Sequence, residues 1–511
     1  MPTTTKPLNG SAQPVDLGFG YALRAPGLRG TVTARDGRQP GTRAAETSAT
    51  EALDEAFRHT DVQEARTIEL AVTAAPLPPA AAPLRTSRGD DAFELDVPAP
   101  GPGRGQIVMA SNEAGAIHWI LPEPESEHAA VANNRDSGPR RRFRIPREIV
   151  QAPLDGQSSR GLLTWARRKI LKVLVYPLTD PIVGAFADHY ARQWEEANRP
   201  YGVRWFTPQD YDQPHGRALT AADWKTLAGG RTLLFVHGTF STAHSGFAGI
   251  DRAKMQELSD RYDGRMIAFN HFTLSDAPDR NVARLLEAMP PGLRLPDVDI
   301  ICHSRGGLVA RTLAENPTAF DIATERIDVK RIVFVAVPNN GTLLANPTHM
   351  VQMIDRLTTI LNVIPTNFVT EFLEGMITAV KVIGHGGLKA LDGLAAMNPD
   401  THVNQFLRKL NSTGTKGAVR YFAMTSDYEP VDAALRSVTW MRRADAVIDR
   451  VFEDAANDLV VPTLGVYDTN GSAYFPLGTD VLLPFDRKAG VIHTAFFQEK
   501  EAQNAILNWL R

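Results

Sequence analysis

The spacing of hydrophobic and polar positions changes near residue 200. Before that point, apolar and polar residues alternate with a period of two, as in Thr67-Ile-Glu-Leu-Ala-Val72, and this period is typical of half-buried strands. Similar strand-like segments occur at 93–97, 106–110, 116–121 and 143–145. The pattern predicts a small β-rich accessory domain over residues 56–148.

The segments on either side of this domain have different patterns. Residues 1–55 are rich in Thr, Ala, Gly, Pro and Arg and lack a sustained period, which predicts a disordered tail. Residues 162–175 and 182–197 carry apolar side chains at spacings of three and four. This spacing predicts a helical connector over residues 149–202.

After residue 203, strand-like and helix-like segments alternate. Strands are expected at 203–206, 231–236, 265–270, 298–301, 331–337, 419–424 and 481–484, and helices at 221–227, 247–262, 281–288, 308–312 and 496–510. Such alternation predicts an α/β domain over residues 203–511, with a mostly parallel sheet flanked by helices. Residues 343–397 are apolar, helix-prone and too long for a simple connection, so we expect a helical cap there.

Length, charge and cysteine content exclude some classes of protein. A chain of 511 residues is expected to form two or three domains. A net charge of -3 gives no overall attraction to nucleic acid or membranes. Cys302 is the only cysteine, which excludes an internal disulfide framework and a cysteine-based metal cluster. We therefore expect no metal and no cofactor.

Two further features concern location and partners. Residues 1–16 have no apolar core, and the apolar run 170–186 is interrupted by charged residues and prolines, so a cytoplasmic location is expected. Segment 140–172 holds the one local concentration of Arg and Lys. It suits peripheral contact with anionic lipid or an acidic partner, and a solvated face at a domain junction is the simpler interpretation. Nucleic-acid binding is not expected, because aromatic platforms are not interleaved with these charges.

A candidate nucleophile lies between a predicted strand and a predicted helix. The strand ends shortly before Ser304 and the helix opens shortly after it. A sharp strand-to-helix turn requires small residues two places before and two places after such a serine. Cys302 and Gly306 occupy these places, so the motif is Cys-x-Ser-x-Gly.

A serine nucleophile needs a base, and the base needs a carboxylate that orients it. His493, just before the last helix, is the preferred base; His385 and His402 are weaker candidates because nothing anchors them to the sheet edge. Asp458 is the preferred carboxylate, since the apolar residues that follow it would fix its loop. Asp427 and Asp454 are the alternatives.

The oxyanion of an acyl-transfer reaction needs two backbone donors. The first is expected from the amide of Arg305, which follows the serine. The second is expected in the loop after strand 231–236, where Gly238 precedes the candidates Thr239 and, as second choice, Phe240.

Five segments then resemble the signatures of one superfamily. They are Phe235-Val-His-Gly-Thr239, Cys302-His-Ser-Arg-Gly-Gly307, Val335-Ala-Val-Pro-Asn-Asn-Gly-Thr342, Asn457-Asp-Leu-Val-Val-Pro462 and His493-Thr-Ala-Phe-Phe497. In this order they resemble the lipase/esterase branch of the α/β-hydrolase superfamily, including bacterial triacylglycerol lipases and glycosylphosphatidylinositol inositol-deacylase-like hydrolases. The resemblance covers about residues 230–510 and departs at Cys302, where the family has glycine.

The resemblance implies an α/β-hydrolase fold, a Ser304–His493–Asp458 triad, an oxyanion amide at Thr239 and a mobile lid over 343–397. We expect a serine hydrolase that cleaves carboxylic esters, either small-molecule or lipid, through an acyl-enzyme. The alternatives are a thioesterase, acyltransferase or amidase with the same triad, and a non-catalytic hydrolase-fold protein that binds a partner.

Overall fold

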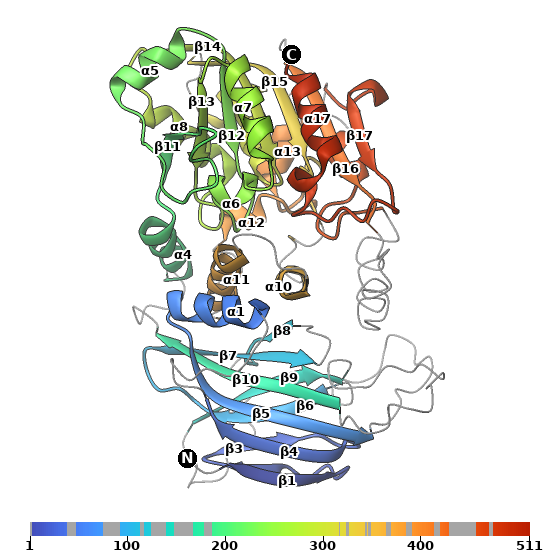
Figure 1. The fold of residues 1–511 in the computed structure, drawn as a ribbon. Coiled ribbons are helices and arrows are strands. Elements are labelled where there is room, and N and C mark those ends of the chain that lie inside the picture. Colours follow the sequence, from blue (N-terminus) through green and yellow to red (C-terminus); the bar gives the residue numbers. More distant parts are fainter. Residues whose placement is uncertain are drawn as a thin grey trace. The chain divides into compact units, whose positions relative to one another are not determined.

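The computed structural model describes the residues 3–37, 48–74, 92–112, 117–123, 139–147, 167–177, 186–315, 317–322, 326–342, 345, 349–363, 369–384, 391–412, 419–428, 456–469 and 474–511. The chain forms two compact units. The first consists of residues 1–186 with 354–366 and 380–386, and the second of residues 187–353, 367–379 and 387–511. Each unit has its own sheet system (Figure 1).

The first unit is built from two antiparallel sheets. One has the strand order β1-β4-β5-β10-β7-β8 and the other the order β2-β3-β6-β9. The strands are β1 (Thr4–Asn9), β2 (Val15–Gly18), β3 (Tyr21–Arg24), β4 (Arg29–Asp36), β5 (Gln63–Ala74), β6 (Ala92–Pro98), β7 (Arg104–Asn112), β8 (Ile117–Ile120), β9 (Arg140–Pro146) and β10 (Arg167–Pro177), and helix α1 spans Ser48–His59. Both sheets contribute side chains to one hydrophobic core, including Val32 and Leu171 from the first sheet and Leu95 and Phe143 from the second.

Two predictions for this unit are wrong. Residues 4–36, expected in a disordered tail, form strands β1 to β4, because β3 and β4 pair with the later strands β6 and β5 and connect β2 and β1 to the two sheets. Residues 167–177, expected in a helix, form strand β10 between β5 and β7. Its Leu171 and Val173 point into the core, and β-branched residues favour a strand once both neighbours supply hydrogen bonds.

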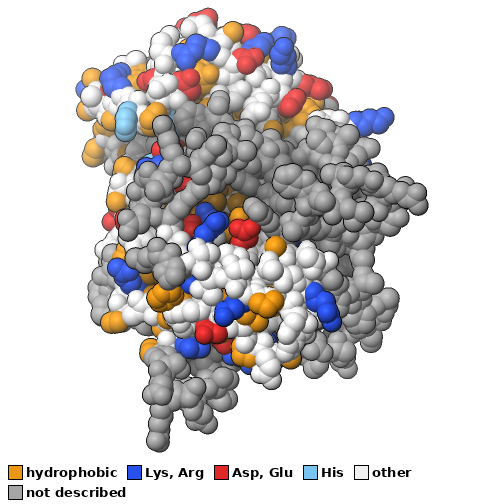
Figure 2. Space-filling view, turned by 60° about the horizontal axis from the view of Figure 1, so that its bottom comes forward, with side chains coloured by type: hydrophobic (Ala, Val, Ile, Leu, Met, Phe, Trp, Pro, Cys, Tyr) orange, Lys and Arg blue, Asp and Glu red, His pale blue; other side chains and the backbone are white. Residues whose placement is uncertain are grey.

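The basic segment is partly neutralised within the first unit. Arg142 Nε donates to Asp96 Oδ1 at 2.7 Å across the β6–β9 pair. Lys172 Nζ lies 3.1 Å from Glu64 Oε2. On the face drawn in Figure 2, basic and acidic side chains are interspersed over the described surface. These pairings favour the interpretation as a solvated face, and contact with anionic lipid stays a prediction.

The second unit contains a seven-stranded sheet in the order β11-β13-β12-β14-β15-β16-β17. The strands are β11 (Gly202–Trp205), β12 (Thr232–Val236), β13 (Met266–Asn270), β14 (Leu295–His303), β15 (Ile327–Val335), β16 (Arg420–Ser426) and β17 (Leu482–Phe485). Only β11 runs antiparallel to its neighbour among these strands; the other pairs are parallel. This is the mostly parallel α/β sheet that the alternation of elements predicts.

The helices of this unit cover both faces of the sheet. They are α4 (Phe186–Asn198), α5 (Ala221–Ala228), α6 (Ala243–Phe247), α7 (Arg252–Arg261), α8 (Pro278–Ala288), α9 (Gly306–Ala314), α13 (Gln405–Ser412), α16 (Leu464–Tyr467) and α17 (Lys500–Trp509), with short 3-10 turns at Pro317–Phe320, Thr479–Val481 and Phe496–Gln498. On one face, α7 and α17 (Figure 1) pack on a core that contains Phe235, Ile301 and Val333. On the other face, α9 packs on β14 and β15 and contacts α8. Helices on both faces bury both sides of the central parallel strands, and all residues of β12 are buried.

The predicted cap segment is helical where the structure describes it. It contains α10 (Met350–Val363), α11 (Val369–Ile383) and α12 (Asp392–Ala395). Residues 354–363 of α10 and 380–383 of α11 belong to the first unit, and the rest of these helices to the second. The segment is therefore divided between the two units, which the sequence pattern did not indicate.

Asp299 and Cys302 are buried side chains of the central strand β14. Asp299 Oδ2 accepts hydrogen bonds from Arg231 Nε at 2.6 Å, Tyr262 at 2.7 Å and Arg331 Nη1 at 3.0 Å. Cys302 is fully buried, and its thiol donates to Val333 O at 3.3 Å. Burial raises the pKa of this thiol well above its usual value. The cysteine that replaces the expected glycine is thus accommodated between two strands.

No helix within the described part of the chain is both long and apolar enough to cross a membrane.

Candidate active site

Ser304 occupies the turn between β14 and α9. Its φ is 50°, a left-handed conformation that non-glycine residues adopt rarely and at a cost of about 1–3 kcal/mol. Its amide donates to Val335 O at 2.9 Å, so the neighbouring strand holds the turn. The following glycine is required: a Cβ on Gly306 would lie 2.4 Å from Val236 O. The small residue expected two places after the serine therefore lets α9 start directly against β12.

The loop after β12 lies against the serine. A Cβ on Gly238 would lie 2.7 Å from Ser304 Cβ and 3.1 Å from His303 O, so only glycine allows this approach. Thr239 follows, with its hydroxyl 3.9 Å from Met397 Sδ, and Phe240 is buried with a φ of 60°. The loop expected to supply an oxyanion donor is thus next to the expected nucleophile.

The orientation of the Gly238–Thr239 peptide is held by side chains of the same loop. Gly238 O accepts hydrogen bonds from His237 Nδ1 at 3.0 Å and from Ser241 Oγ at 3.0 Å. His237 Nε2 accepts from the His271 amide at 3.2 Å, so Nδ1 carries the proton. Burial lowers the pKa of His237 to about 3, which keeps the ring neutral. Because the carbonyl and the amide of a trans peptide point in opposite directions, fixing Gly238 O also fixes the direction of the Thr239 N–H.

Asp458 and His493 are brought together from positions 35 residues apart. His493 Nδ1 lies 2.8 Å from Asp458 Oδ2, and the His493 amide donates to Asp458 O at 3.1 Å. The other carboxylate oxygen, Oδ1, accepts from the amides of Val460 at 3.0 Å and Val461 at 2.7 Å. Both side chains are buried. The backbone after Asp458 thus fixes the carboxylate, and the carboxylate fixes the ring.

His303 connects the serine turn to the histidine loop. Its Nε2 lies 2.9 Å from His493 O, and the two rings lie 4.9 Å apart between centroids. Burial, with the nearby His493 as a smaller contribution, lowers the pKa of His303 to about 3, so the ring is neutral and Nε2 donates to the carbonyl. The residue before Ser304 therefore holds the backbone of His493.

The structure separates the other candidates from this group. Asp427 Oδ2 accepts from Arg487 Nε at 2.7 Å on the surface, and His402 is exposed in a turn closed by Asp400. His385 and Asp454 lie outside the described residues. Within the described residues, no hydrogen bond joins Ser304 Oγ to His493, so the pair that the structure brings into direct contact is His493 with Asp458.

The Arg305 side chain is turned away from solvent into the body of the unit. It is fully buried, and its guanidinium donates to the carbonyls of Gly393 on α12, at 2.7 Å, and of Asp276. Burial lowers the pKa of Arg305 to about 10. The side chain thus anchors the turn that carries Ser304, while the sequence interpretation concerns only its backbone amide.

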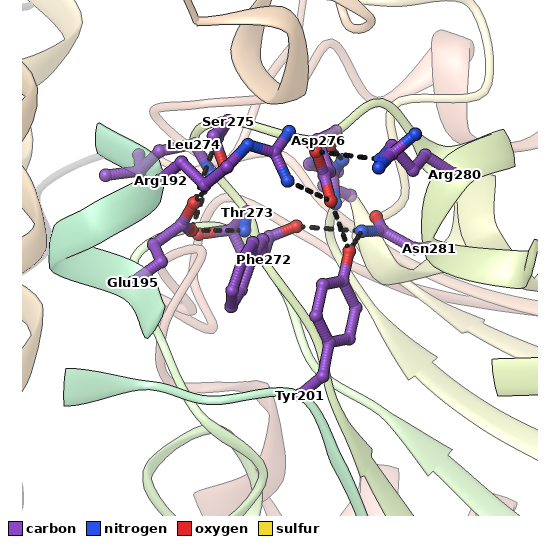
Figure 3. A network of polar contacts seen from close by, with 11 residues as sticks. Arg192, Glu195, Tyr201, Phe272, Thr273, Leu274, Ser275, Asp276, Arg280 and Asn281 are labelled. Carbon is purple, nitrogen blue, oxygen red and sulfur yellow. Dashed lines mark hydrogen bonds and ion pairs between the residues drawn. The ribbon is translucent and has the colours of Figure 1, made fainter. Parts of the chain in front are cut away.

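A buried polar network fixes the loop that receives Arg305 (Figure 3). Glu195 on α4 accepts from the amides of Thr273 at 2.6 Å, Leu274 at 2.9 Å and Ser275 at 3.0 Å. Burial raises the pKa of Glu195, and these amide donors oppose the shift.

Asp276 forms the second half of the same network. It accepts from Tyr201 Oη at 2.8 Å and pairs with Arg192 of α4 and Arg280 of α8 (Figure 3). Glu195 and Asp276 together place opposite charges near the Arg305 guanidinium, which offsets part of the cost of burying it.

Sequence reasoning missed His303, His237, Ser241, Glu195 and Asp276 as supports of this site. His303 directly precedes Ser304, and His237 stands two residues before Thr239. A polar residue at the end of an apolar strand was the available signal. Glu195 and Asp276 carry no local signal, because their partners become neighbours only through the fold.

Among the described residues, no group of three or more His, Cys, Asp or Glu side chains is arranged to hold a metal ion.

The second unit is therefore an α/β domain with a mostly parallel sheet, in which a strained serine turn, a glycine loop and a histidine–aspartate pair meet. Residues 198–511, more than half of the chain, match the family described as Domain of unknown function (DUF7379), and the chain belongs to this family. No curated protein matches it in sequence.

Three solved structures illustrate what the chain is similar to. The lipase BlEst2 from Bacillus licheniformis is 14% identical over 55% of this chain and 92% of that chain, with a TM-score of 0.33. Lipase 1 from Pelosinus fermentans is 13% identical over 55% and 97%, with a TM-score of 0.38. The metagenomic carboxyl esterase MGS0156 is 15% identical over 55% and 76%, with a TM-score of 0.29. At this level of similarity, no residue role transfers from these proteins to this chain.

Proposed function

We propose that the second unit is an α/β-hydrolase domain and that the protein is a serine hydrolase of carboxylic esters. The observation that carries the proposal is the 2.8 Å contact between His493 Nδ1 and Asp458 Oδ2, in a unit where Ser304 forms a left-handed turn after a central parallel strand. The order serine, aspartate, histidine along the chain is the order of that fold.

In the proposed reaction Ser304 Oγ attacks the ester carbonyl carbon and passes its proton to His493 Nε2. Asp458 keeps the proton of the ring on Nδ1, so that Nε2 is free to accept. The amides of Thr239 and Arg305 donate hydrogen bonds to the oxygen that becomes negative. The alcohol leaves with the proton from His493, and Ser304 carries the acyl group.

Water then completes the cycle. It gives a proton to His493 Nε2 and attacks the acyl carbon, after which Ser304 leaves, regains its proton and releases a carboxylic acid. The chemistry needs no cofactor or metal. Hydrogen bonds between a nucleophile and its base commonly tighten in the reacting complex, and we expect the Ser304–His493 hydrogen bond to form there.

The proposal is tested with Ser304→Ala. We expect loss of fluorophosphonate labelling and a fall in p-nitrophenyl ester hydrolysis on the order of 10⁵- to 10⁶-fold, with an unchanged circular dichroism spectrum. Ser241→Ala is unsuitable as the control because Ser241 supports the glycine loop; Ser259→Ala, on helix α7, is a matched control that should keep full activity. Undiminished turnover by Ser304→Ala would refute the proposal.

A further inference from the structure

Helix α11 of the predicted cap reaches the loop that follows β12. Glu371 Oε1 lies 2.6 Å from His244 Nε2, and Glu371 Oε2 accepts from Thr242 Oγ1 at 3.0 Å. Thr242 and His244 stand only three and five residues after Thr239, at the start of the short helix α6. A carboxylate that lies 127 residues away in the chain is thus bound to the loop of the proposed oxyanion donor.

The His244 ring forms hydrogen bonds with both Glu371 and Thr242. A carboxylate only accepts hydrogen bonds, so His244 Nε2 donates to Glu371. The other ring nitrogen, Nδ1, lies 2.8 Å from Thr242 Oγ1. Both oxygens of Glu371 thus accept hydrogen bonds from this loop, and hydrogen bonds to a carboxylate are stronger than those between neutral groups.

The backbone of α11 also packs directly on this loop. A Cβ on Gly375 would lie 3.3 Å from the Cα of Phe240 and 3.1 Å from Arg199 Nη1. Phe240 has a φ of 60° and is fully buried, and such a conformation persists only where surrounding structure enforces it. Gly375 lets the helix approach closely enough to provide that support.

Arg199 fixes the same turn of α11 from a third side. Its guanidinium donates to Glu371 O and stacks over the Trp194 ring at 4.8 Å. Glu371 therefore approaches the loop from a helix turn that is itself held in place.

We infer that Glu371 is a positioning residue for the proposed oxyanion loop, acting through His244 and Thr242. His237 and Ser241 hold the loop through hydrogen bonds to Gly238 O. Glu371 and Gly375 of α11 contact the same loop at residues 240–244. If so, the turn of α11 that carries Glu371 is a fixed part of the site. A mobile lid would then consist of other parts of the cap segment. The expected effect on kcat rests on the proposed function, whereas the expected effect on the stability of the loop rests on these contacts alone.

The structural consequence is tested by hydrogen–deuterium exchange of peptides that cover residues 239–247. Glu371→Gln should raise the exchange of these amides about 10-fold relative to wild type, because a neutral amide binds the two donors less strongly than a carboxylate does. Glu287→Gln removes the same charge from an exposed ion pair with Arg284 on helix α8 and should leave this exchange unchanged. Equal exchange in wild type and Glu371→Gln would overturn the inference, whether or not the protein hydrolyses esters.

The kinetic consequence is tested on ester hydrolysis at neutral pH. Glu371→Gln should lower kcat by about 10- to 100-fold with little change in KM, since a donor displaced by a fraction of an ångström is lost mainly in the transition state. Glu371→Asp, which keeps the charge, should recover part of kcat. The kcat of the double variant Glu371→Gln with His244→Gln should fall by no more than about the larger of the two single-variant losses, because both residues act through one contact.

Faster exchange with an unchanged kcat would show that Glu371 stabilises the loop without positioning a donor, and would overturn the positioning role. Activity that survives Ser304→Ala would instead refute the proposed function and leave the exchange result to decide on the loop contact. If Glu371→Gln does not fold, Glu371→Asp and the close-approach variant Gly375→Ala carry the same two measurements.

Discussion

Among the described residues of the second unit, the pairs His493–Asp458 and His244–Glu371 use the imidazole ring differently. In the His493–Asp458 pair only Nδ1 is bound, and within the described residues no hydrogen bond engages Nε2. In the His244–Glu371 pair both ring nitrogens are bound, Nε2 by Glu371 and Nδ1 by Thr242. A ring with one free nitrogen can exchange a proton with a substrate or nucleophile, whereas a ring with both nitrogens occupied can only hold two elements together. Contact with a carboxylate alone therefore does not distinguish a catalytic histidine from a structural one.

The substitution Asp458→Asn tests, with the largest expected effect, whether His493 acts as a base that Asp458 orients. Because Oδ1 accepts two backbone amides, the asparagine oxygen should stay there and its NH₂ should face His493 Nδ1. The ring must then protonate Nε2, which can no longer take the Ser304 proton. We expect ester hydrolysis to fall about 10⁴-fold with little loss of thermal stability.

Asp427→Asn is the control for this prediction. Asp427 pairs with Arg487 on the surface, so its change should leave kcat within about two-fold, as for other exposed ion pairs. A large loss with Asp427→Asn and none with Asp458→Asn would show that the wrong carboxylate is assigned.

A smaller effect is expected where the histidine loop is held by its backbone. His303→Phe removes the donor to His493 O while keeping a ring of similar shape. We expect kcat to fall about 10-fold and stability to fall by about 1–2 kcal/mol, measured by steady-state kinetics and thermal unfolding. His303→Gln keeps an N–H donor and should recover part of both; equal losses in the two variants would argue against the hydrogen bond as the cause.

The smallest effect concerns the pH dependence of stability. Burial alone raises the pKa of Glu371, but the hydrogen bond and charge of His244, with Arg199 and Thr242, outweigh burial and lower it. A lowered folded-state pKa gives stability that is present above the unfolded value of about 4.3 and is lost as the pH falls through the folded value.

Glu371→Gln should therefore weaken the fall of Tm between about pH 5 and pH 3, and should cost about 1–2 kcal/mol at pH 7. Thermal unfolding of wild type and variant across this range measures both. Parallel curves for the two proteins would show that Glu371 is not held as a carboxylate by His244.

The α/β architecture could be predicted from the sequence because its signals are local. Buried runs such as Thr232–Val236 and the helices between them keep their type in the fold. Strand β10 could not be predicted, since its basic and apolar residues also suit a helix and only β5 and β7 decide the outcome. Strands β3 and β4 were missed for a similar reason, since their partners β6 and β5 come later in the chain.

The site divides in the same way. Ser304, Asp458 and His493 stand at motifs with recognisable neighbours, and the structure brings the last two into contact; their catalytic roles stay a prediction. No sequence motif marks Glu371, because its proposed role depends on a contact with His244, which lies 127 residues away in the chain. Supporting residues of this kind become visible only once distant segments are placed beside one another.

Cys302 has a practical consequence for following the protein in solution. It is the only thiol of the chain and is fully buried between β14 and β15, two residues before Ser304. A thiol reagent can reach it only when the central strands open. The rate at which the untagged protein takes up such a reagent therefore reports opening of the sheet beside the proposed nucleophile, independently of any substrate.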